Sequence, residues 1–421
     1  MKEVFKLIIN DFFEKDLNVR KRDINIPLNS NKIVTLVGVR RSGKTFILYD
    51  LVNQLRKQID NENIIYINFE DDRLFGLKAD GLGLLIDAYF EMYPQKRDEK
   101  IYLFLDEIQE VEGWEKFVRR IYDTLNAQIF ITGSSSRMFS KELASALRGR
   151  TITYEIFPLS FKEYLNFKDI DINLYSSKSL SFIKNAFEMY LKEGGFPEIV
   201  FEEDKDIKLR ILRDYVDLII YRDIIDRYNI KNLSLLKFLV KYTFSNPATL
   251  LSFNKLYNEL KTLGFKLSKD TLFDYFSYLT DAYALFTVPI FRSSVKEEIR
   301  NPKKVFIVDN GFNYIFNTSF SEEYSKLYEN LVFLQLRKKY GEIYYFKEKQ
   351  EVDFFIPQDN ILINVSYKID DQKILNREIS ALKEAMKKYN ITQSHLITSD
   401  EEKEIEGIKV MPLWKFLLNF S

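Results

Sequence analysis

The sequence predicts an α/β protein with a parallel sheet, followed by a helical region and a second, smaller α/β unit. Three observations predict this fold class. Apolar runs alternate with helical patterns up to Pro158, mainly helical patterns follow, and the alternation returns from Val305. Strands that alternate with helices form parallel sheets. A chain of 421 residues has room for about two to four domains.

The composition narrows the chemistry. Hydrophobic residues make up 46% of the chain and charged residues 29%, as in ordinary globular proteins. The net charge is zero, so a nucleic-acid surface would have to be local. There are no cysteines and a single histidine, which excludes disulfides and argues against a zinc site. An oxygen-bound metal such as Mg²⁺ is therefore expected.

No segment has the features of a membrane or secretion signal. No stretch approaches the roughly 18 uncharged apolar residues that a membrane span needs. The first residues, MKEVFKLIINDFFEKD, carry acids around a short apolar run, unlike a signal peptide. We expect a cytoplasmic protein without a membrane partner.

The first α/β region contains five expected strands and four expected helices. Each strand is a short apolar run, as is typical of strands buried on both faces. The expected strands are 33–37, 64–69, 101–105, 128–132 and 151–156, and the expected helices are 44–59, 82–93, 114–125 and 140–147.

A phosphate-binding loop follows the first strand. The segment from Gly38 to Thr45, GVRRSGKT, fits G-x-x-x-x-G-K-[ST] between a strand and a helix, which is the context that this motif requires. Backbone N–H groups and the helix N-terminus would bind phosphate, Lys44 would reach the β- and γ-phosphates, and Thr45 would ligate Mg²⁺. The expected ATP or ADP contacts are Gly38, Val39, Arg40, Arg41, Ser42, Gly43, Lys44, Thr45 and Phe46.

Two acids end the third strand, in the segment IYLFLDE. Asp106 is expected to hold Mg²⁺, and Glu107 to orient and deprotonate the attacking water. An acid pair alone can be a solvated strand end. One βαβ spacing after a phosphate-binding loop, it predicts a catalytic pair and an Mg²⁺-dependent ATPase.

Three further residues are candidates for the catalytic site. Ser134 follows the strand expected beside the phosphate-loop strand, where it or Thr132 would contact the attacking water or the γ-phosphate, or else cap a helix. Arg148 and Arg150 would reach a phosphate in a neighbouring subunit as arginine fingers, or else form a surface pair of cations.

These motifs resemble those of AAA+-superfamily ATPases found in archaea and bacteria. The resemblance lies in GVRRSGKT, LFLDEIQEVEGWE, ITGSSSRMFSKELASALRGR and FPLSFKEYL, and extends to GGFPEIV, NPKKVFIVDNG, YENLVF and EVDFF. It implies an AAA+ core at 1–157, a helical lid at 158–230, a winged helix at 231–292 and a restriction-endonuclease-like domain at 293–421. It also implies that Ser134 acts as a sensor, that Arg148 and Arg150 act as fingers, and that the chain can form a homo-oligomer.

The expected winged helix has conflicting charges. Its second helix, capped by Ser268, would enter a DNA groove, but Lys269 is outnumbered by Asp270, Asp274 and Asp281. A ribbon is expected at 284–291. The linker 292–304 carries five cations against two acids, a net charge of +3, and would suit phosphate. The region predicts either a DNA contact or a protein-docking surface.

The last domain departs from a nuclease pattern. Strands are expected at 305–308, 343–346, 352–356, 361–366 and 395–398. In nucleases of the implied type, Asp353 and Glu329 would hold Mg²⁺ together with an E-x-K on the next strand. Asn364 and Ser366 occupy those two positions instead, and Lys368 is the nearest lysine in sequence. We therefore expect a domain without strong nuclease activity.

The leading interpretation is an ATPase coupled to DNA binding or remodelling. One alternative is a slow nucleotide switch that docks protein partners, and another is an ATP-coupled nuclease with a degraded site.

Overall fold

The computed structural model describes residues 1–134, 147, 149–292, 294–317 and 324–420. The chain divides into an N-terminal unit, Met1–Ile156, and a C-terminal unit, Phe157–Ser421. Within the described residues, no helix combines the length and the apolar character needed to cross a bilayer. The expected α/β class is confirmed, because the chain has a parallel sheet, a helical region and a separate C-terminal sheet.

The N-terminal unit contains a five-stranded parallel sheet. Its strands are β1 (Ile33–Val37), β2 (Ile64–Asn68), β3 (Ile101–Asp106), β4 (Ala127–Gly133) and β5 (Thr151–Glu155), in the order β2-β3-β4-β1-β5. β4 pairs with β1, as predicted. The carboxyl ends of β1, β3 and β4 therefore meet at one edge of the sheet, where ligands bind in open α/β sheets.

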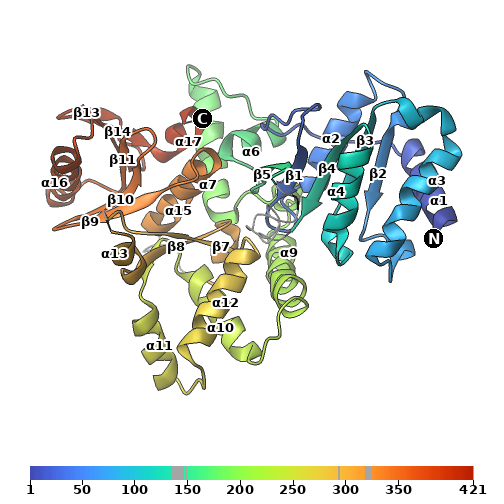
Figure 1. Cartoon of the computed structure of the whole chain (residues 1–421). Helices are drawn as coiled ribbons and strands as arrows, with labels where there is room; N and C mark the ends of the chain where they lie inside the picture. The colour runs from blue at the N-terminus through green and yellow to red at the C-terminus, as the bar shows by residue number, and fades with distance from the viewer. Residues whose placement is uncertain (135–146, 148, 293, 318–323, 421) are drawn as a thin grey trace. The chain divides into compact units, whose positions relative to one another are not determined.

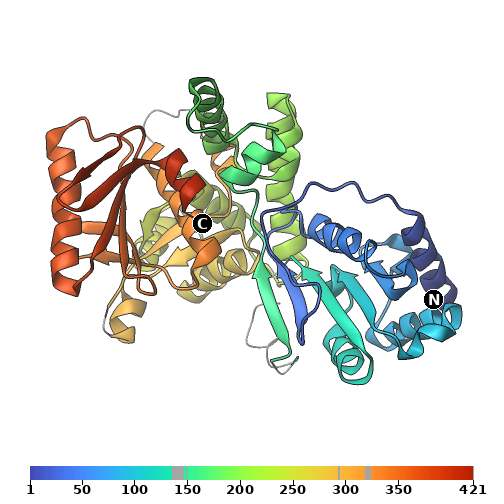
Figure 2. The same cartoon turned by 90° about the horizontal axis from the view of Figure 1, so that it is seen from above.

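Helices cover both faces of this sheet. They are α1 (Lys2–Glu14), α2 (Lys44–Leu55), α3 (Gly83–Met92) and α4 (Trp114–Thr124), with 3-10 turns at Asn61–Asn63, Asp72–Leu74, Ala79–Leu82, Pro94–Asp98 and Ile108–Glu110. α1 and α2 share a core with one face of the sheet. α2 and α4 lie on opposite faces (Figures 1 and 2). The helix expected at 140–147 lies outside the described residues except for Leu147.

The C-terminal unit begins with helices, as expected. They are α6 (Phe161–Phe167), α7 (Ser177–Glu193), α8 (Pro197–Phe201), α9 (Lys205–Leu218) and α10 (Leu233–Ser245). Ser160 and Glu163 form a capping box at the start of α6. A π-helix over Ile219–Ile225 extends α9.

A helix pair and a three-stranded sheet follow. α11 (Phe253–Thr262) and α12 (Lys269–Asp281) are joined by a short turn, and Ser268 caps α12 as predicted. β7 (Leu285–Val288) pairs with β8 (Lys303–Ile307), which also pairs with β6 (Thr249–Leu251). Two predictions are therefore wrong. The ribbon is not contained within 284–291, and the strand expected at 305–308 does not belong to the C-terminal sheet.

The charged segment between β7 and β8 is structured. It contains α13 (Val295–Arg300), and its last two residues begin β8. After β8 come α14 (Gly311–Tyr314) and α15 (Tyr324–Lys339).

A six-stranded mixed sheet ends the chain. Its strands are β9 (Tyr344–Lys347), β10 (Glu351–Ile356), β11 (Ile361–Val365), β12 (Gln393–Thr398), β13 (Lys403–Ile405) and β14 (Ile408–Pro412), in the order β13-β14-β12-β11-β10-β9. α16 (Gln372–Tyr389) covers one face, and α15 with α17 (Leu413–Asn419) covers the other (Figure 2).

Candidate functional site

The phosphate-binding loop has the backbone that its glycines make possible. Gly38 has φ 149° and Gly43 has φ 96°, conformations that side chains disfavour. A Cβ added to Gly38 would lie 2.1 Å from the carbonyl oxygen of Ile156. The loop thus needs glycine at Gly38 both for its conformation and for the close approach of the chain after β5.

Lys44 begins α2 directly after the phosphate-binding loop, and its side chain is buried against that loop. Its Nζ donates to the carbonyl oxygens of Gly38 and Val39 at 3.1 and 3.2 Å. It also lies 3.7 Å from Glu107 Oε1. The ammonium is therefore held at the mouth of the loop, within reach of both phosphate and the predicted base.

Asp106 is the centre of a hydroxyl network. Its Oδ2 accepts from Thr45 Oγ1 at 2.8 Å and from the Tyr66 hydroxyl at 2.6 Å, while Oδ1 accepts from Thr132 Oγ1. Burial raises the pKa of Asp106 and the charge of Glu107 adds to this, while the three hydroxyl donors act in the opposite direction. These donors stabilise the charged form of the Asp106 carboxylate, which burial disfavours.

Glu107 is held by its backbone as well as by its side chain. It has φ 53°, an uncommon conformation for a residue with a side chain. Its N–H donates to Thr132 Oγ1 at 2.8 Å, and its carboxylate accepts from the Gln109 amide. Thr132 thus connects the two acids.

The remaining loop residues differ in exposure. Arg40 donates to Glu70 at 2.7 Å, Arg41 is exposed, and the Phe46 side chain is 56% exposed. The buried Ser42 hydroxyl has no hydrogen-bond partner among the described residues. An orphaned hydroxyl in this loop fits a site that takes an additional polar ligand.

Of the three weaker candidates, the structure describes Ser134 and Arg150. Ser134 is fully buried directly after β4. Arg148 lies outside the described residues. Arg150 precedes β5, next to Ile33 at the opposite edge of the sheet from the phosphate loop, and its guanidinium binds Asp123 at 3.0 Å.

The geometry fits a nucleotide with Mg²⁺. Loop N–H groups and Lys44 would bind the phosphates, and the oxygens of Thr45 and Asp106, already 2.8 Å apart, would hold the metal. Glu107 lies beside them, as a base must. Sequence reasoning missed Tyr66, because a tyrosine in a buried strand has the pattern of an ordinary core residue.

A second polar cluster lies in the C-terminal unit. We call Glu329, Glu351 and Asp353 the acid cluster. The ammonium of Lys304, which is 2% exposed, lies 2.7, 2.8 and 2.8 Å from them respectively. The three acids hold the pKa of Lys304 well above its usual value in spite of burial. The prediction that Lys304 belongs to a phosphate-contacting strip is therefore wrong.

Of the predicted nuclease residues, Glu329 and Asp353 bind this ammonium, whereas Asn364 and Ser366 have other partners. Asp353 accepts from the N–H of Val365, and Asn364 accepts from the N–H of Asp353 at 3.1 Å. The Asn364 amide donates to Glu378 at 2.7 Å, while Ser366 donates to the backbone of Lys368. Across the described ranges, no group of three or more acids or histidines is arranged to hold a metal ion.

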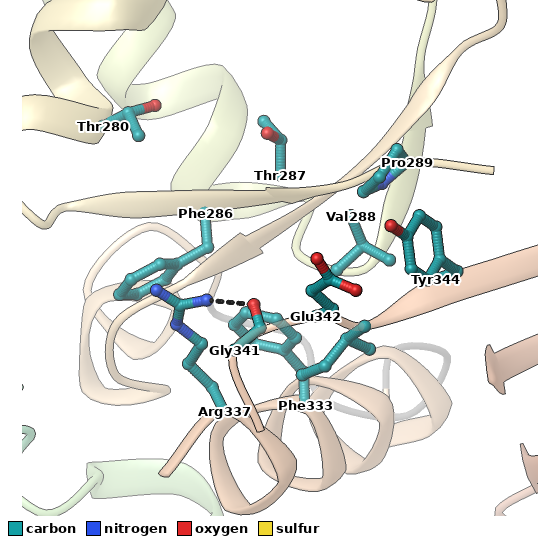
Figure 3. Close-up of a pocket in the computed structure, with 11 residues that line it drawn as sticks. Thr280, Phe286, Thr287, Val288, Pro289, Phe333, Arg337, Gly341, Glu342 and Tyr344 are labelled. Atoms are coloured by element: carbon teal, nitrogen blue, oxygen red, sulfur yellow. Dashed lines mark hydrogen bonds between the residues drawn. The ribbon is translucent and has the colours of Figure 1, made fainter. Parts of the chain in front are cut away.

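A cavity of about 290 Å³ opens beside the end of β7 in the same unit. Figure 3 shows its apolar wall of Phe286, Val288 and Phe333, with Arg337 donating to the carbonyl of Gly341 at 2.9 Å. Arg337 thus holds the loop after α15 in place. The polar groups around the cavity are not directed at one point, as they are in a specific ligand site.

The fold and site of the N-terminal unit define a class of protein, the AAA-type P-loop ATPases. Consistent with this, residues 30–165 match the family description of an AAA domain. Residues 184–320 and 324–416 match two domains of unknown function, DUF8612 and DUF4143.

Two relatives span nearly the whole chain. An uncharacterized protein of Methanocaldococcus jannaschii is 37% identical over 440 residues, which cover 100% of this chain and 96% of that one. An uncharacterized protein of Haemophilus influenzae is 33% identical over 391 residues, covering 92% and 94%. The chain belongs to the family of these two proteins, and its own residues 30–165 match the AAA domain.

Solved structures are more distant. A Walker-type ATPase of Pyrococcus abyssi has a TM-score of 0.44 and 15% identity, covering 72% of this chain and 99% of that one. The Orc1 protein of Aeropyrum pernix, solved in complex with DNA, has a TM-score of 0.33 and 12% identity, covering 68% and 87%. Similarity at this level carries no argument about function.

Proposed function

We propose that the N-terminal unit hydrolyses ATP in a Mg²⁺-dependent reaction. The supporting observation is the convergence of Lys44, Thr45, Asp106 and Glu107 at one edge of the sheet. When bound, Mg²⁺ would neutralise charge on the β- and γ-phosphates. Lys44 would bind the same oxygens, and Glu107 would orient the attacking water and accept its proton.

Steady-state ATP hydrolysis with Mg²⁺ tests this proposal. Lys44→Ala should abolish nucleotide binding, whereas Glu107→Gln should keep ATP binding and lose at least about 100-fold in turnover. The control is Glu112→Gln, an exposed acid five positions further on, which should match the unaltered protein. Normal ATP affinity in Lys44→Ala would refute the site, and undiminished turnover in Glu107→Gln would remove Glu107 as the base.

We further propose that α10–α12 and the β6-β8-β7 sheet form a winged helix. Its elements follow the helix-helix-helix and strand order of such domains, with α12 in the position of a recognition helix. On α12, Asp270 and Asp274 flank an exposed Phe273, and Lys269 is drawn back to Asn254 at 2.8 Å. This face would repel phosphate.

The charges now favour a protein partner over duplex DNA. Of the cations in the expected strip, Lys304 is buried in the acid cluster and Arg292 pairs with Glu348 at 3.2 Å. Three cations remain against two acids, a net charge of +1, down from +3. We therefore favour a nucleotide switch that docks protein through this domain, with DNA as the competing partner.

Turnover with added nucleic acid separates these two partners. A switch should turn over slowly, retain ADP, and ignore single-stranded, duplex and branched DNA. Stimulation by one of these forms, lost in Lys296→Ala and Arg300→Ala, would establish DNA as the partner and overturn the protein-docking proposal.

For the C-terminal sheet, we propose a nuclease-like domain without metal-dependent cleavage. The Lys304 ammonium fills the space among the carboxylates that a metal would need. Cleavage of DNA with Mg²⁺ or Mn²⁺ that disappears in Asp353→Ala would contradict this.

A further inference from the structure

The Tyr66 hydroxyl makes a buried contact with the predicted metal ligand. Tyr66 lies on β2, is 4% exposed, and donates to Asp106 Oδ2 at 2.6 Å. A carboxylate oxygen accepts hydrogen bonds, so the Tyr66 phenol is the donor in this contact. The contact is a hydrogen bond to a charged group, the stronger class of such bonds.

This hydrogen bond gives Oδ2 of Asp106 a second donor beside Thr45. Thr132 binds Oδ1, and Thr45 binds Oδ2. A Thr45 oxygen that ligated Mg²⁺ through a lone pair could still donate its proton to Oδ2. Tyr66 would be the donor to Oδ2 that does not itself ligate the metal, and it would hold the carboxylate in its orientation.

The N-terminal helix holds the ring of Tyr66. Phe12 of α1 stacks on it, with ring centroids 4.3 Å apart and an interplanar angle of 13°. Arg56, which directly follows α2, lies 5.4 Å from the centroid of the Phe12 ring and donates to the Phe12 carbonyl at 3.0 Å. Arg56, Phe12 and Tyr66 thus form one packed series that ends on Asp106.

We propose that Tyr66 is a positioning residue for Asp106, and that α1 takes part in metal-nucleotide binding by holding Tyr66 through Phe12. α1 precedes the matched AAA domain, which starts at residue 30. The inference rests on the proposed Mg²⁺-dependent ATPase and adds the residues that set its affinity for metal.

Mn²⁺ binding to the ADP complex of the full chain, followed by electron paramagnetic resonance, tests the proposal without using activity. Tyr66→Phe removes only the hydroxyl, and should raise the Mn²⁺ dissociation constant about three- to tenfold. ADP affinity in EDTA should stay unchanged. Phe12→Leu keeps apolar bulk but loses the stacked ring, and should shift Mn²⁺ affinity in the same direction.

The matched control is Tyr102→Phe. Tyr102 lies on the adjacent strand β3, is 6% exposed, and donates to Asn29 at 2.8 Å, away from Asp106. This variant should bind Mn²⁺ as the unaltered protein does, with a similar melting temperature to Tyr66→Phe.

The outcomes are distinguishable. Unchanged or tighter Mn²⁺ binding in Tyr66→Phe, or an equal loss in Tyr102→Phe, would overturn the positioning role while the proposed ATPase stands. If the unaltered protein bound no Mn²⁺ with ADP, both proposals would fall.

Discussion

Replacing Lys304 with methionine should destabilise the C-terminal unit strongly. The substitution keeps most of the side-chain volume but removes the ammonium, and leaves three carboxylates without their shared cation. Breaking a buried ion pair by removing one partner costs about 3–5 kcal/mol. A domain whose unfolding free energy is about 5–15 kcal/mol would lose a large part of it.

The two tryptophans allow the measurement to be made in one unit at a time. Trp114 is buried in the N-terminal unit and Trp414 in the C-terminal unit, on α17. In a Trp114→Phe background, Trp414 fluorescence during urea unfolding reports the C-terminal unit. Lys303→Met is the control, because Lys303 is adjacent on β8 but half-buried and should cost no more than about 0.5 kcal/mol.

The pH dependence supplies a second readout. Burial and Asp353 already raise the pKa of Glu329 to about 8 with Lys304 present. Without the ammonium, which lowers the pKa of Glu329, that pKa should rise further above its unfolded value, so the stability of the variant should be higher at low pH and lost as pH rises. The deficit of Lys304→Met should therefore shrink between pH 7 and pH 5. If Lys304→Met lowered the unfolding free energy by less than about 1 kcal/mol, and by no more than Lys303→Met does, this reasoning would be refuted.

Three further outcomes are expected. Burial raises the pKa of Asp309 to about 7, so stability should fall by about 2–4 kcal/mol as pH rises from 4 to 8, and Asp309→Asn should flatten that slope in urea titrations. Gly38→Ala should weaken ADP binding at least about tenfold, because its Cβ has no room, while circular dichroism stays unchanged; normal affinity would contradict the loop geometry. Arg150→Ala breaks a partly exposed pair with Asp123 and should cost at most about 1 kcal/mol. If Arg150 is a finger, mixing this variant with Glu107→Gln should restore ATP hydrolysis, and no restoration would remove the assignment.

The N-terminal unit was predictable because its signals are local. A parallel strand buried on both faces is an apolar run, and the phosphate loop is a continuous motif, so β1 to β5 and Asp106 could be placed from sequence. What the sequence did not reveal was the network around Asp106. Nothing in a run of strand residues shows that the Tyr66 hydroxyl points at an acid on the neighbouring strand.

The C-terminal unit was less predictable because its pairings are not local. The run VFIV has the pattern of a buried strand. This pattern does not show which sheet the strand joins, and β8 pairs with β7 rather than with the C-terminal sheet. The hairpin of β13 and β14 was missed, although Glu406 and Gly407, with φ 50° and 82°, form a two-residue turn of a recognisable kind. Charge was equally misleading at Lys304, whose partners lie 25 to 49 positions later in the chain.

One short segment, 303–313, makes buried polar contacts with several separate elements of the C-terminal unit. Lys304 binds the acids of α15 and β10, and Asp309 accepts from the backbone of the turn between α7 and α8 at 2.7 Å. Asn310 donates to the end of α7 at 3.0 Å, and Asn313 donates to the end of α10 at 3.0 Å. A buried polar group needs its partner at hydrogen-bond distance, so these ties fix positions more narrowly than apolar contacts do. The segment therefore sets how the helices and both sheets of this unit fit together.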